Sequence, residues 1–378
     1  MRTLASIKSC LIDGNHRGVK VLLALLVTLA CSCEPLVTTF EEVEEAEYYQ
    51  AHNIEVPPLP DTLHAMTWNI KYGGADIDFW WACYGDRVLM TEDEVLYNLE
   101  RLTAYINQVN PDILLLQEVA VSSKQAAYVN QMQYILDHTA LNYGVYAPMW
   151  RVQYVPSDGL GRSDLGPAVL SRWPLDEAQR IGLELRTDQD ALTRYFYIRR
   201  CMVRVRLNHQ DLDNFYMLTV HTAAWSQDDT KKLHIDRFVT ELDAMVAEGN
   251  WFVAGGDLNT IPPGSQRWND FPDAKCGGDF EGGDYSDEQA YLSGLYGSNA
   301  YSAAPPLEEY QQASDQSGYF TYGDKPDSLG FTRKLDYLFT NLSWVPDSWH
   351  THQEIASGGS TLSDHAPISA KIILSDVR

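Results

Sequence analysis

The sequence contains little cysteine and no cysteine pattern that builds a site. Of its 378 residues six are cysteine, and three of these, Cys83, Cys201 and Cys276, follow residue 33. Three cysteines close at most one bridge and none belongs to a C-x-x-C pair, so a disulfide framework is not expected. We expect these thiols to be buried and to pack as small apolar side chains.

The chain also lacks the short motifs of two large hydrolase classes. It has no H-E-x-x-H and no G-x-S-x-G, which argues against zinc peptidases and serine hydrolases. The glycine-rich stretch GLGRSDLG, residues 159–166, does not match G-x-G-x-x-G and follows no clear strand-to-helix unit. Nucleotide binding is therefore not expected there.

Positive charge is scarce. The sequence has 28 Lys and Arg against 52 Asp and Glu, which gives a formal net charge of −24. This balance repels polyanions at long range and disfavours an extended surface for DNA or RNA, whereas it suits divalent cations. The hydrophobic share of 45% is typical of a folded protein, and the length allows one large two-sheet α/β domain.

No apolar run is long enough for a permanent membrane span. The run from Val21 to Ala30 would extend only about 15 Å as a helix, half of the hydrocarbon thickness. It follows basic residues and precedes Cys31-Ser32-Cys33, an order that predicts a signal peptide over 1–33 with a lipobox-like end. We expect a protein lipid-anchored to a bacterial outer membrane or cell surface. Either cysteine fits as the anchor, and the alternative is a secreted or periplasmic protein.

Residues 34–60 differ in composition from the rest of the chain. They begin with the acidic run 41–45 and end with the proline-rich run 57–60, and neither type of sequence builds a core. We interpret the segment as a tether. Residues 61–378 are then the folded domain, expected to be monomeric without an obligate protein partner.

The domain pattern has about twice as many strands as helices. A strand over HAMTWNI, a helix over 91–109 and a strand over PDILLLQEV form its first unit, and 263–330 is expected to be a long surface loop. Helices are expected at 123–139 and 229–248, and strands at 143–149, 167–171, 195–207, 215–220, WFVAGG, LDYLFT and HAPISAKII. Consecutive strands favour mixed sheets packed face to face with helices outside.

Three polar clusters follow apolar strands, where a sheet opens to solvent. They are Gln117-Glu118, Asp257-Leu258-Asn259 and Ser363-Asp364-His365. Asp257 and Asn259 face the same side of an extended chain, and the glycines before them allow close approach of another backbone or a ligand. Hard oxygen ligands of this kind suit Mg²⁺.

The motifs around these clusters resemble those of the endonuclease/exonuclease/phosphatase superfamily, in the family order from about His64 to Ile373. That resemblance implies the deoxyribonuclease-I-like fold, a four-layer α/β sandwich of two mixed β-sheets flanked by helices. The matching stretches are MTWNIKYGG with Asn69, PDILLLQEV with Glu118, GPAVLSRWPL, TVHTAAW with His221, GGDLNTIP with Asp257 and Asn259, RKLDYLFT with Asp336, and SDHAPISAKI with Asp364 and His365.

The resemblance also implies roles. Mg²⁺, or Mn²⁺ as an alternative, would be held by Glu118, with Asn69 and Asp364 completing the site. His365 would take a proton from water while Asp336 fixes its tautomer. The remaining roles are positioning of water or phosphate by Asp257 and Asn259, and donation to a phosphate oxygen or leaving group by His221.

The expected activity is hydrolysis of a phosphoester, first of all a phosphodiester, in a small, lipid or nucleic-acid substrate. The alternatives are a secreted endonuclease acting on DNA or RNA and an inactive surface binding module on the same fold. An inactive copy is expected to lose at least one catalytic residue, and all are present. Pro167, where many members have Asn, and the additional segment 75–87 put substrate choice in doubt.

Several conspicuous side chains belong to no cluster in the sequence. Six histidines are expected to be surface or hydrogen-bonded core residues: His52, His64, His209, His234, His350 and His352. Trp80, Trp81 and the aromatic residues of 319–322 are expected to pack in the core.

Overall fold

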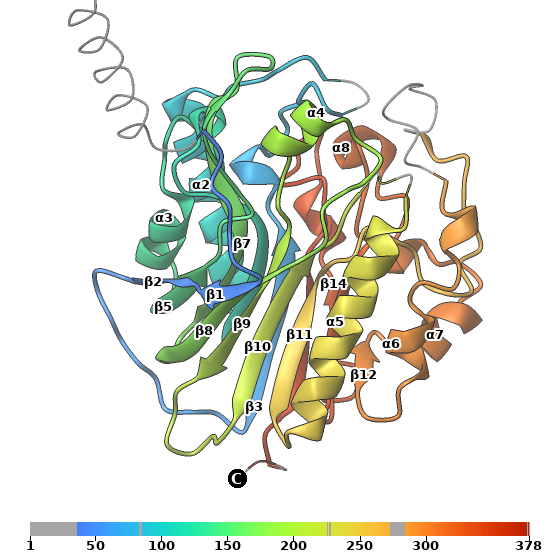
Figure 1. Cartoon of the computed structure of the whole chain (residues 1–378). Helices are drawn as coiled ribbons and strands as arrows, with labels where there is room; N and C mark the ends of the chain where they lie inside the picture. The colour runs from blue at the N-terminus through green and yellow to red at the C-terminus, as the bar shows by residue number, and fades with distance from the viewer. Residues whose placement is uncertain are drawn as a thin grey trace, which may run out of the picture.

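The computed structural model describes residues 36–82, 85–224, 226, 228–272, 284–375 and 377, which form two β-sheets packed face to face (Figure 1). The proposed signal peptide with Cys31 and Cys33 lies outside these residues, as do Cys83 and Cys276. Cys201 is a free, buried thiol, as expected. Within the described part of the chain, no helix has the length and apolarity needed to cross a membrane.

The first sheet has eight strands. Seven follow the order β14-β15-β3-β4-β7-β5-β2, and β6 pairs with β7 outside this path. Their bounds are β2 (Glu47–Gln50), β3 (Thr62–Asn69), β4 (Ile113–Ala120), β5 (Tyr143–Tyr146), β6 (Trp150–Val155), β7 (Gly161–Ser171), β14 (His350–Thr351) and β15 (Ile368–Ile373). β3 and β4 are parallel, and β15 runs antiparallel to β3.

The second sheet has seven strands in the order β1-β8-β9-β10-β11-β13-β12. Their bounds are β1 (Val43–Glu45), β8 (Leu175–Gly182), β9 (Cys201–Leu207), β10 (Phe215–His221), β11 (Trp251–Asp257), β12 (Ser302–Ala304) and β13 (Asp336–Thr340). β10 and β11 are parallel, whereas β13 runs antiparallel to β11. Both sheets are therefore mixed, as predicted.

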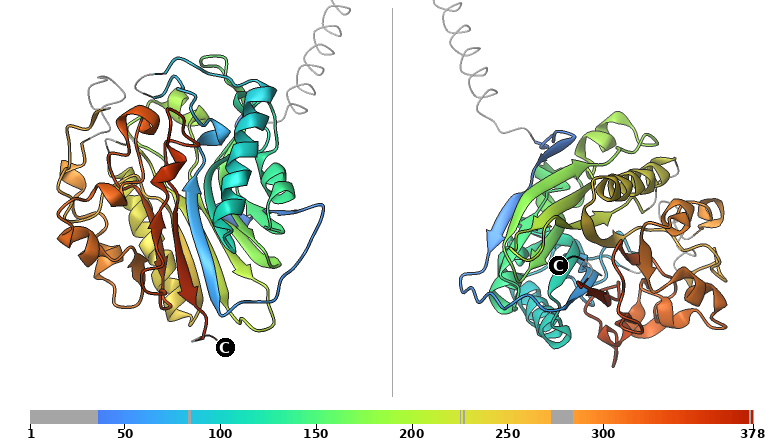
Figure 2. Two further views of the ribbon diagram at one scale, coloured as in Figure 1. Left: turned by 180° about the vertical axis from the view of Figure 1, so that it is seen from behind. Right: turned by 90° about the horizontal axis from the view of Figure 1, so that it is seen from below.

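Helices cover the outer faces of the two sheets (Figure 2). α2 (Glu92–Val109) and α3 (Gln131–His138) bury a cluster that includes Leu102 and Ile135 against the first sheet, and α5 (Thr230–Ala247) buries Phe238 against the second. A third cluster fills the space between the sheets. These layers confirm the predicted four-layer sandwich.

Short helical segments complete the described structure. They are η1 (Lys71–Gly73), η2 (Lys124–Ala126), α4 (Ala191–Phe196), η5 (Ser286–Glu288), α6 (Ser293–Gly297), α7 (Leu307–Gln312), η6 (Ser317–Tyr319), α8 (Pro326–Leu329) and η7 (Gln353–Ile355). Several lie in 263–330, so the prediction of a loop without secondary structure was wrong. Its apolar residues gather locally: Leu295 of α6 packs with the α5 cluster, and β12 extends the second sheet.

The N-terminal boundary of the domain also needs correction. Residues 43–50 form edge strands, with β1 on β8 and β2 on β5, where the composition suggested a tether. Even Val37 already forms a β-bridge with Val152. The acidic charge is accommodated because Glu47 pairs with Arg151 at 2.6 Å, and Tyr48 accepts a hydrogen bond from the backbone of β8.

Two predicted elements differ from the structure in their extent. The helix of 123–139 divides into η2 and α3, because the Asn130 side chain caps α3 by accepting from the Gln133 amide. The strand of 195–207 begins only at Cys201, since Asp190 caps the short helix α4 before it. The capping box of α2 was predicted correctly: Thr91 accepts from the Glu94 amide, and the Glu94 carboxylate accepts from the Thr91 amide.

Candidate active site

The strand directions bring the predicted site residues to one end of the sandwich. β3, β4, β10 and β11 all finish there, whereas the antiparallel strand β13 begins there. Register places Asn69 opposite Gln117 in one sheet, and Asp257 beside both His221 and Asp336 in the other. Facing ends of the two sheets therefore supply a single polar cluster.

The closest contact in the cluster is the predicted pair of His365 and Asp336. His365 Nδ1 lies 2.8 Å from Asp336 Oδ2, and both residues are buried. This bond fixes the imidazole so that Nε2 faces Asp257 Oδ2, 3.6 Å away. A histidine held in this way has one nitrogen to exchange a proton with a ligand while the other stays engaged.

Asp257 lies at the centre of the cluster. Its Oδ2 accepts from the Asn69 amide at 3.2 Å and lies 3.4 Å from His221 Nε2. Its Oδ1 accepts from the Asn259 backbone at 2.9 Å, which orients the carboxylate. Burial, reinforced by Asp336 against the opposing effect of His365, raises the pKa of Asp257 to about 6. Asn259 donates through its own amide to Thr222 O at 3.1 Å.

The close approach of backbone at this point requires glycine before Asp257. Gly256 has a φ of +136°, and a Cβ there would lie 2.0 Å from Val220 O on β10. At Gly255 it would lie 2.1 Å from Tyr337 O on β13. The predicted close approach is thus to neighbouring strands, which draws His221 and Asp336 towards Asp257.

Glu118 occupies a bulge of β4. The register of β4 against β7 shifts between Leu116 and Val119, and Glu118 has a φ of +59°, a conformation that is uncommon for a residue with a side chain. The bulge turns Glu118 towards the cluster, where its carboxylate accepts from Asn69 at 3.2 Å. Burial and the nearby Asp364 raise the pKa of Glu118 to about 7.

The two site histidines differ in charge. Burial by itself would lower the pKa of His365, but Asp336 and Asp257 outweigh it and raise the pKa to about 10. Burial and Arg200 instead hold the pKa of His221 well below its usual range. Without a cation in the site, the carboxylates therefore favour the protonated form of His365, whereas His221 is a neutral donor.

The donor set fits a hard divalent cation. Glu118 and Asp364 lie close enough to raise the proton affinity of Glu118, a repulsion that a cation would relieve. Lys71 Nζ, 4.0 Å from Asp364, compensates only partly. Asn69 faces the carboxylates with its NH₂ group, while its oxygen accepts from the Lys71 backbone at 3.1 Å. Its role as a metal ligand stays a prediction.

A second arrangement of ligand atoms is less suitable for the cation. Asp257, Asp336 and His365 each offer an atom within 4.8 Å of the others. An ion among them would replace the bond between His365 and Asp336. That bond is already short and buried, which favours proton transfer for these three residues and leaves Glu118 and Asp364 as the candidate cation ligands.

Two residues of the site carried no signal in the sequence. Thr321 accepts the backbone hydrogens of Leu335 and Asp336 at 2.9 and 3.0 Å, which fixes the start of β13. The ring of Tyr322 lies against His365, with centroids 4.9 Å apart. Both come from 263–330, which was expected to be a long surface loop, and Tyr322 was expected to pack in the core. Of the aromatic residues expected in the core, Trp80 and Trp81 pack against core clusters but are only partly buried, and Tyr319 stacks on Trp349.

The additional segment 75–87 braces the closing motif of the site. Asp76 accepts from the Thr361 backbone, two residues before Ser363, and also contacts Arg101 of α2 at 3.4 Å. Asp78 pairs with Lys325 at 2.7 Å, next to α8. The segment therefore connects three regions that surround Asp364 and His365.

His234 holds the loop that follows His221. Its Nδ1 accepts from the Ala223 backbone at 3.1 Å, and its Nε2 lies 2.8 Å from Glu184 O. Protonation of Nδ1 would replace this acceptor with a donor that faces another donor. Burial accordingly lowers the pKa of His234 to about 4.

We therefore expect the titration of His234 to lower the free energy of unfolding by about 1–2 kcal/mol between pH 7.5 and pH 5. The unfolded chain binds a proton near pH 6.5, whereas folded His234 does so only near pH 4, so stability decreases as pH falls through this window. His234→Gln keeps an acceptor and a donor but does not titrate, and His52→Gln is the exposed control. Urea unfolding at both pH values measures the difference. An equal loss of stability in His234→Gln and wild type would contradict the assignment.

The chain belongs to the endonuclease/exonuclease/phosphatase family, whose model matches residues 66–365. The family comprises phosphoesterases and nucleases, so the fold and site define a hydrolase of phosphoester bonds. No curated protein matches the chain.

The comparison with solved structures finds matches at low sequence identity. An endonuclease/exonuclease/phosphatase from Beutenbergia cavernae DSM 12333 is 17% identical, with a TM-score of 0.52 over 83% of this chain and 72% of that one. A mannosyl-6-phosphatase from Bacteroides thetaiotaomicron VPI-5482 is 11% identical, with a TM-score of 0.47 over 82% and 98%. TDP2 from C. elegans is 15% identical, with a TM-score of 0.46 over 82% and 75%.

Proposed function

We propose that this protein is a Mg²⁺-dependent phosphoesterase that hydrolyses a phosphodiester. The observation that carries the proposal is the buried pair of Asp336 and His365, whose free nitrogen faces Asp257. A general base needs a fixed tautomer and a second nitrogen that can exchange a proton with water. Asp336 fixes Nδ1, and Nε2 becomes the accepting nitrogen once a bound cation lowers the proton affinity of His365.

Each residue then has a defined task. His365 Nε2 takes the proton of the attacking water while Nδ1–H keeps donating to Asp336. Asp257 orients that water, and neutral His221 donates from Nε2 to a phosphate oxygen or to the leaving group. Glu118 and Asp364 would hold Mg²⁺, whose positive charge would stabilise the phosphoryl oxygens and lower the proton affinity of His365.

The alternative of an inactive binding module is disfavoured by the completeness of the cluster. A module that only bound a ligand would not need a buried, tautomer-fixing carboxylate behind a histidine. Here Asp336 is 1% exposed and bonded to His365, and Asp257 is oriented by its own backbone contact.

The alternative of a nuclease that binds long duplex DNA is disfavoured by the contacts of three arginines in β9 and just before it. Arg206 makes two hydrogen bonds to Asp176 at 2.8 Å each, and Arg204 contacts Glu241 at 3.2 Å. Arg200 is buried. These arginines are already neutralised or enclosed, so they provide no basic strip for phosphates.

We therefore expect small or lipid phosphodiesters to be turned over better than duplex DNA at moderate ionic strength. The net charge of −24 repels a long polyanion, while one phosphate can still bind through the metal. The measurement is kcat/KM in Mg²⁺ for bis-p-nitrophenyl phosphate, sphingomyelin, inositol phosphates and duplex DNA across a salt series. Faster cleavage of DNA, with a steep loss in salt, would make the secreted nuclease the better assignment.

The proposed location is a bacterial envelope membrane, through a lipid on Cys31 or Cys33. The support is the apolar run of ten residues that ends in small residues and two cysteines. Palmitate labelling should mark wild type and disappear in Cys31→Ser or in Cys33→Ser, with Cys10→Ser as the control. An unlabelled wild type would show that the anchor proposal is wrong.

A further inference from the structure

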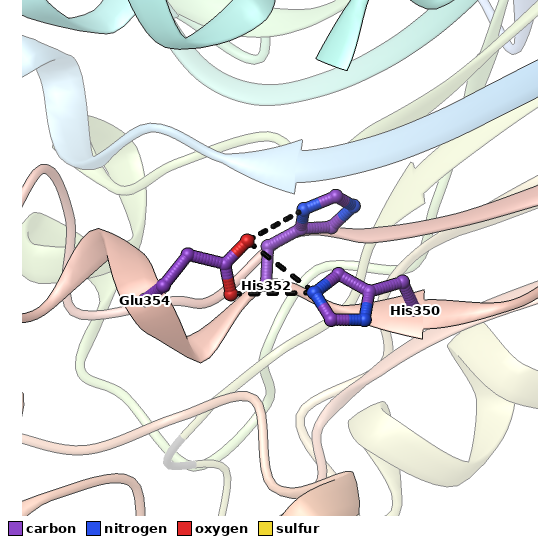
Figure 3. Close-up of side chains that lie close together, drawn as sticks. All are labelled: His350, His352 and Glu354. Atoms are coloured by element: carbon purple, nitrogen blue, oxygen red, sulfur yellow. Dashed lines mark hydrogen bonds and ion pairs between the residues drawn. The ribbon is translucent and has the colours of Figure 1, made fainter. Parts of the chain in front are cut away.

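Two histidines and a glutamate that the sequence left unassigned meet at the edge of the first sheet. His350 begins the edge strand β14, His352 follows that strand, and Glu354 lies in the turn η7. In Figure 3 both imidazoles are directed at the Glu354 carboxylate. Each residue offers one ligand atom within 4.8 Å of the other two.

The distances among these atoms match a shared cation better than direct hydrogen bonds. His350 Nε2 lies 3.3 Å from both oxygens of Glu354, and His352 Nδ1 lies 3.3 Å from Oε1. Charged hydrogen bonds are usually about 2.7–2.9 Å long. Two ligands at about 2.05 Å from a tetrahedral Zn²⁺ are instead roughly 3.3–3.4 Å apart.

His352 is prepared for metal binding by its second nitrogen. Nε2 lies 2.8 Å from the Ser369 hydroxyl on β15, which can hold the ring proton on that nitrogen. The Tyr105 hydroxyl lies 2.9 Å from Nδ1 but donates its single hydrogen to Glu354, so the Nδ1 lone pair stays available on the side of Glu354. A hydrogen bond on the non-ligating nitrogen is typical of histidines that bind metals.

The surroundings leave one side of the cluster open. The side chains of His350 and Glu354 are 56% and 50% exposed, whereas that of His352 is 7% exposed. Tyr105 of α2 donates to Glu354 Oε1 at 2.6 Å, which orients the carboxylate from the protein side. A fourth position therefore faces solvent, where water can complete a tetrahedron.

We propose that His350, His352 and Glu354 bind a Zn²⁺ ion at a second site, separate from the catalytic centre. Two imidazoles with one carboxylate suit Zn²⁺, whereas Mg²⁺ prefers oxygen ligands such as Glu118 and Asp364. The ion would hold β14 and η7 together, and the hydrogen bond from Tyr105 to Glu354 would connect them to α2. The ring of Tyr105 packs on Trp68, whose indole donates to His365 O at 2.8 Å, so the second site supports the strand end that carries His365.

Zinc binding to the whole chain, purified without a polyhistidine tag, tests the proposal. Zn²⁺ is titrated calorimetrically in excess Mg²⁺, and retained zinc is measured by mass spectrometry after desalting. We expect one equivalent per chain and a rise in Tm on zinc addition. His350→Ala and Glu354→Gln should each weaken binding by more than the roughly 10- to 100-fold typical of an outer-shell contact.

Two controls separate this site from other zinc ligands. His52 also faces a single carboxylate, with Nδ1 2.7 Å from Asp137, and His52→Ala should retain the zinc. Asp257→Asn alters the catalytic cluster and should retain it too. Loss of the zinc in Asp257→Asn with full retention in His350→Ala would overturn the proposal, as would a wild type that binds no zinc.

Discussion

Replacing His365 with alanine should lower kcat by roughly 10²–10⁴-fold while KM changes little. The general base acts mainly in the transition state, so its loss affects the chemical step more than substrate binding. Asp336→Asn should act in the same direction because the 2.8 Å contact with Nδ1 would no longer favour the reactive tautomer. Steady-state kinetics on a chromogenic phosphodiester measure both variants.

The double variant distinguishes a working pair from two independent contributions. If His365 and Asp336 act as one unit, removal of both should cost little more than removal of His365 alone. His138→Ala, at the end of α3, is a surface control and should keep the wild-type rate. A His365→Ala variant near the wild-type rate would refute the mechanism.

Glu118→Gln should shift the Mg²⁺ dependence of the reaction by at least about tenfold in concentration. The substitution keeps an oxygen ligand and nearly the same volume but removes the charge that attracts the cation. Asp364→Asn should produce a smaller shift, because the side chain of Asp364 is 19% exposed and Lys71 already lies 4.0 Å away. Activity at graded Mg²⁺ concentrations gives both shifts.

A control variant and a chelation experiment accompany the Mg²⁺ titration. Glu308→Gln changes an exposed carboxylate on α7 and should leave the Mg²⁺ curve unmoved. EDTA should abolish activity, and Mg²⁺ or Mn²⁺ should restore it. Full turnover in EDTA would show that the reaction needs no divalent cation.

The layers of the fold and the members of the site were predictable because both depend on local sequence. Alternating and apolar runs define strands, and candidate site residues stand at their ends, as Asn69 ends β3 and Asp257 ends β11. Parallel neighbours then bring those ends together. The order of motifs was therefore enough to assemble Glu118, Asp257, Asp336 and His365 in one place.

The parts that were missed depend on contacts between distant segments. Tyr322 meets His365, and Tyr105 meets Glu354, across 43 and 249 positions, and no periodic pattern marks such pairs. Composition also misled the reading of 34–60. Its acidic residues suggested a solvated segment. In the structure Glu47 forms an ion pair with Arg151, and its strand β2 pairs with β5.

The β-bridge of Val37 has a consequence for the orientation of the domain. Val37 is bridged to Val152, which pairs with Ser163, and the adjacent Asp164 accepts from Val121, three residues after Glu118. The chain thus enters the domain at the end that holds the active site. If Cys33 carries the lipid, the four residues to Val37 reach at most roughly 13–14 Å. The bilayer surface and the mouth of the active site would then lie on the same side of the molecule, and headgroups would be the nearest phosphodiesters.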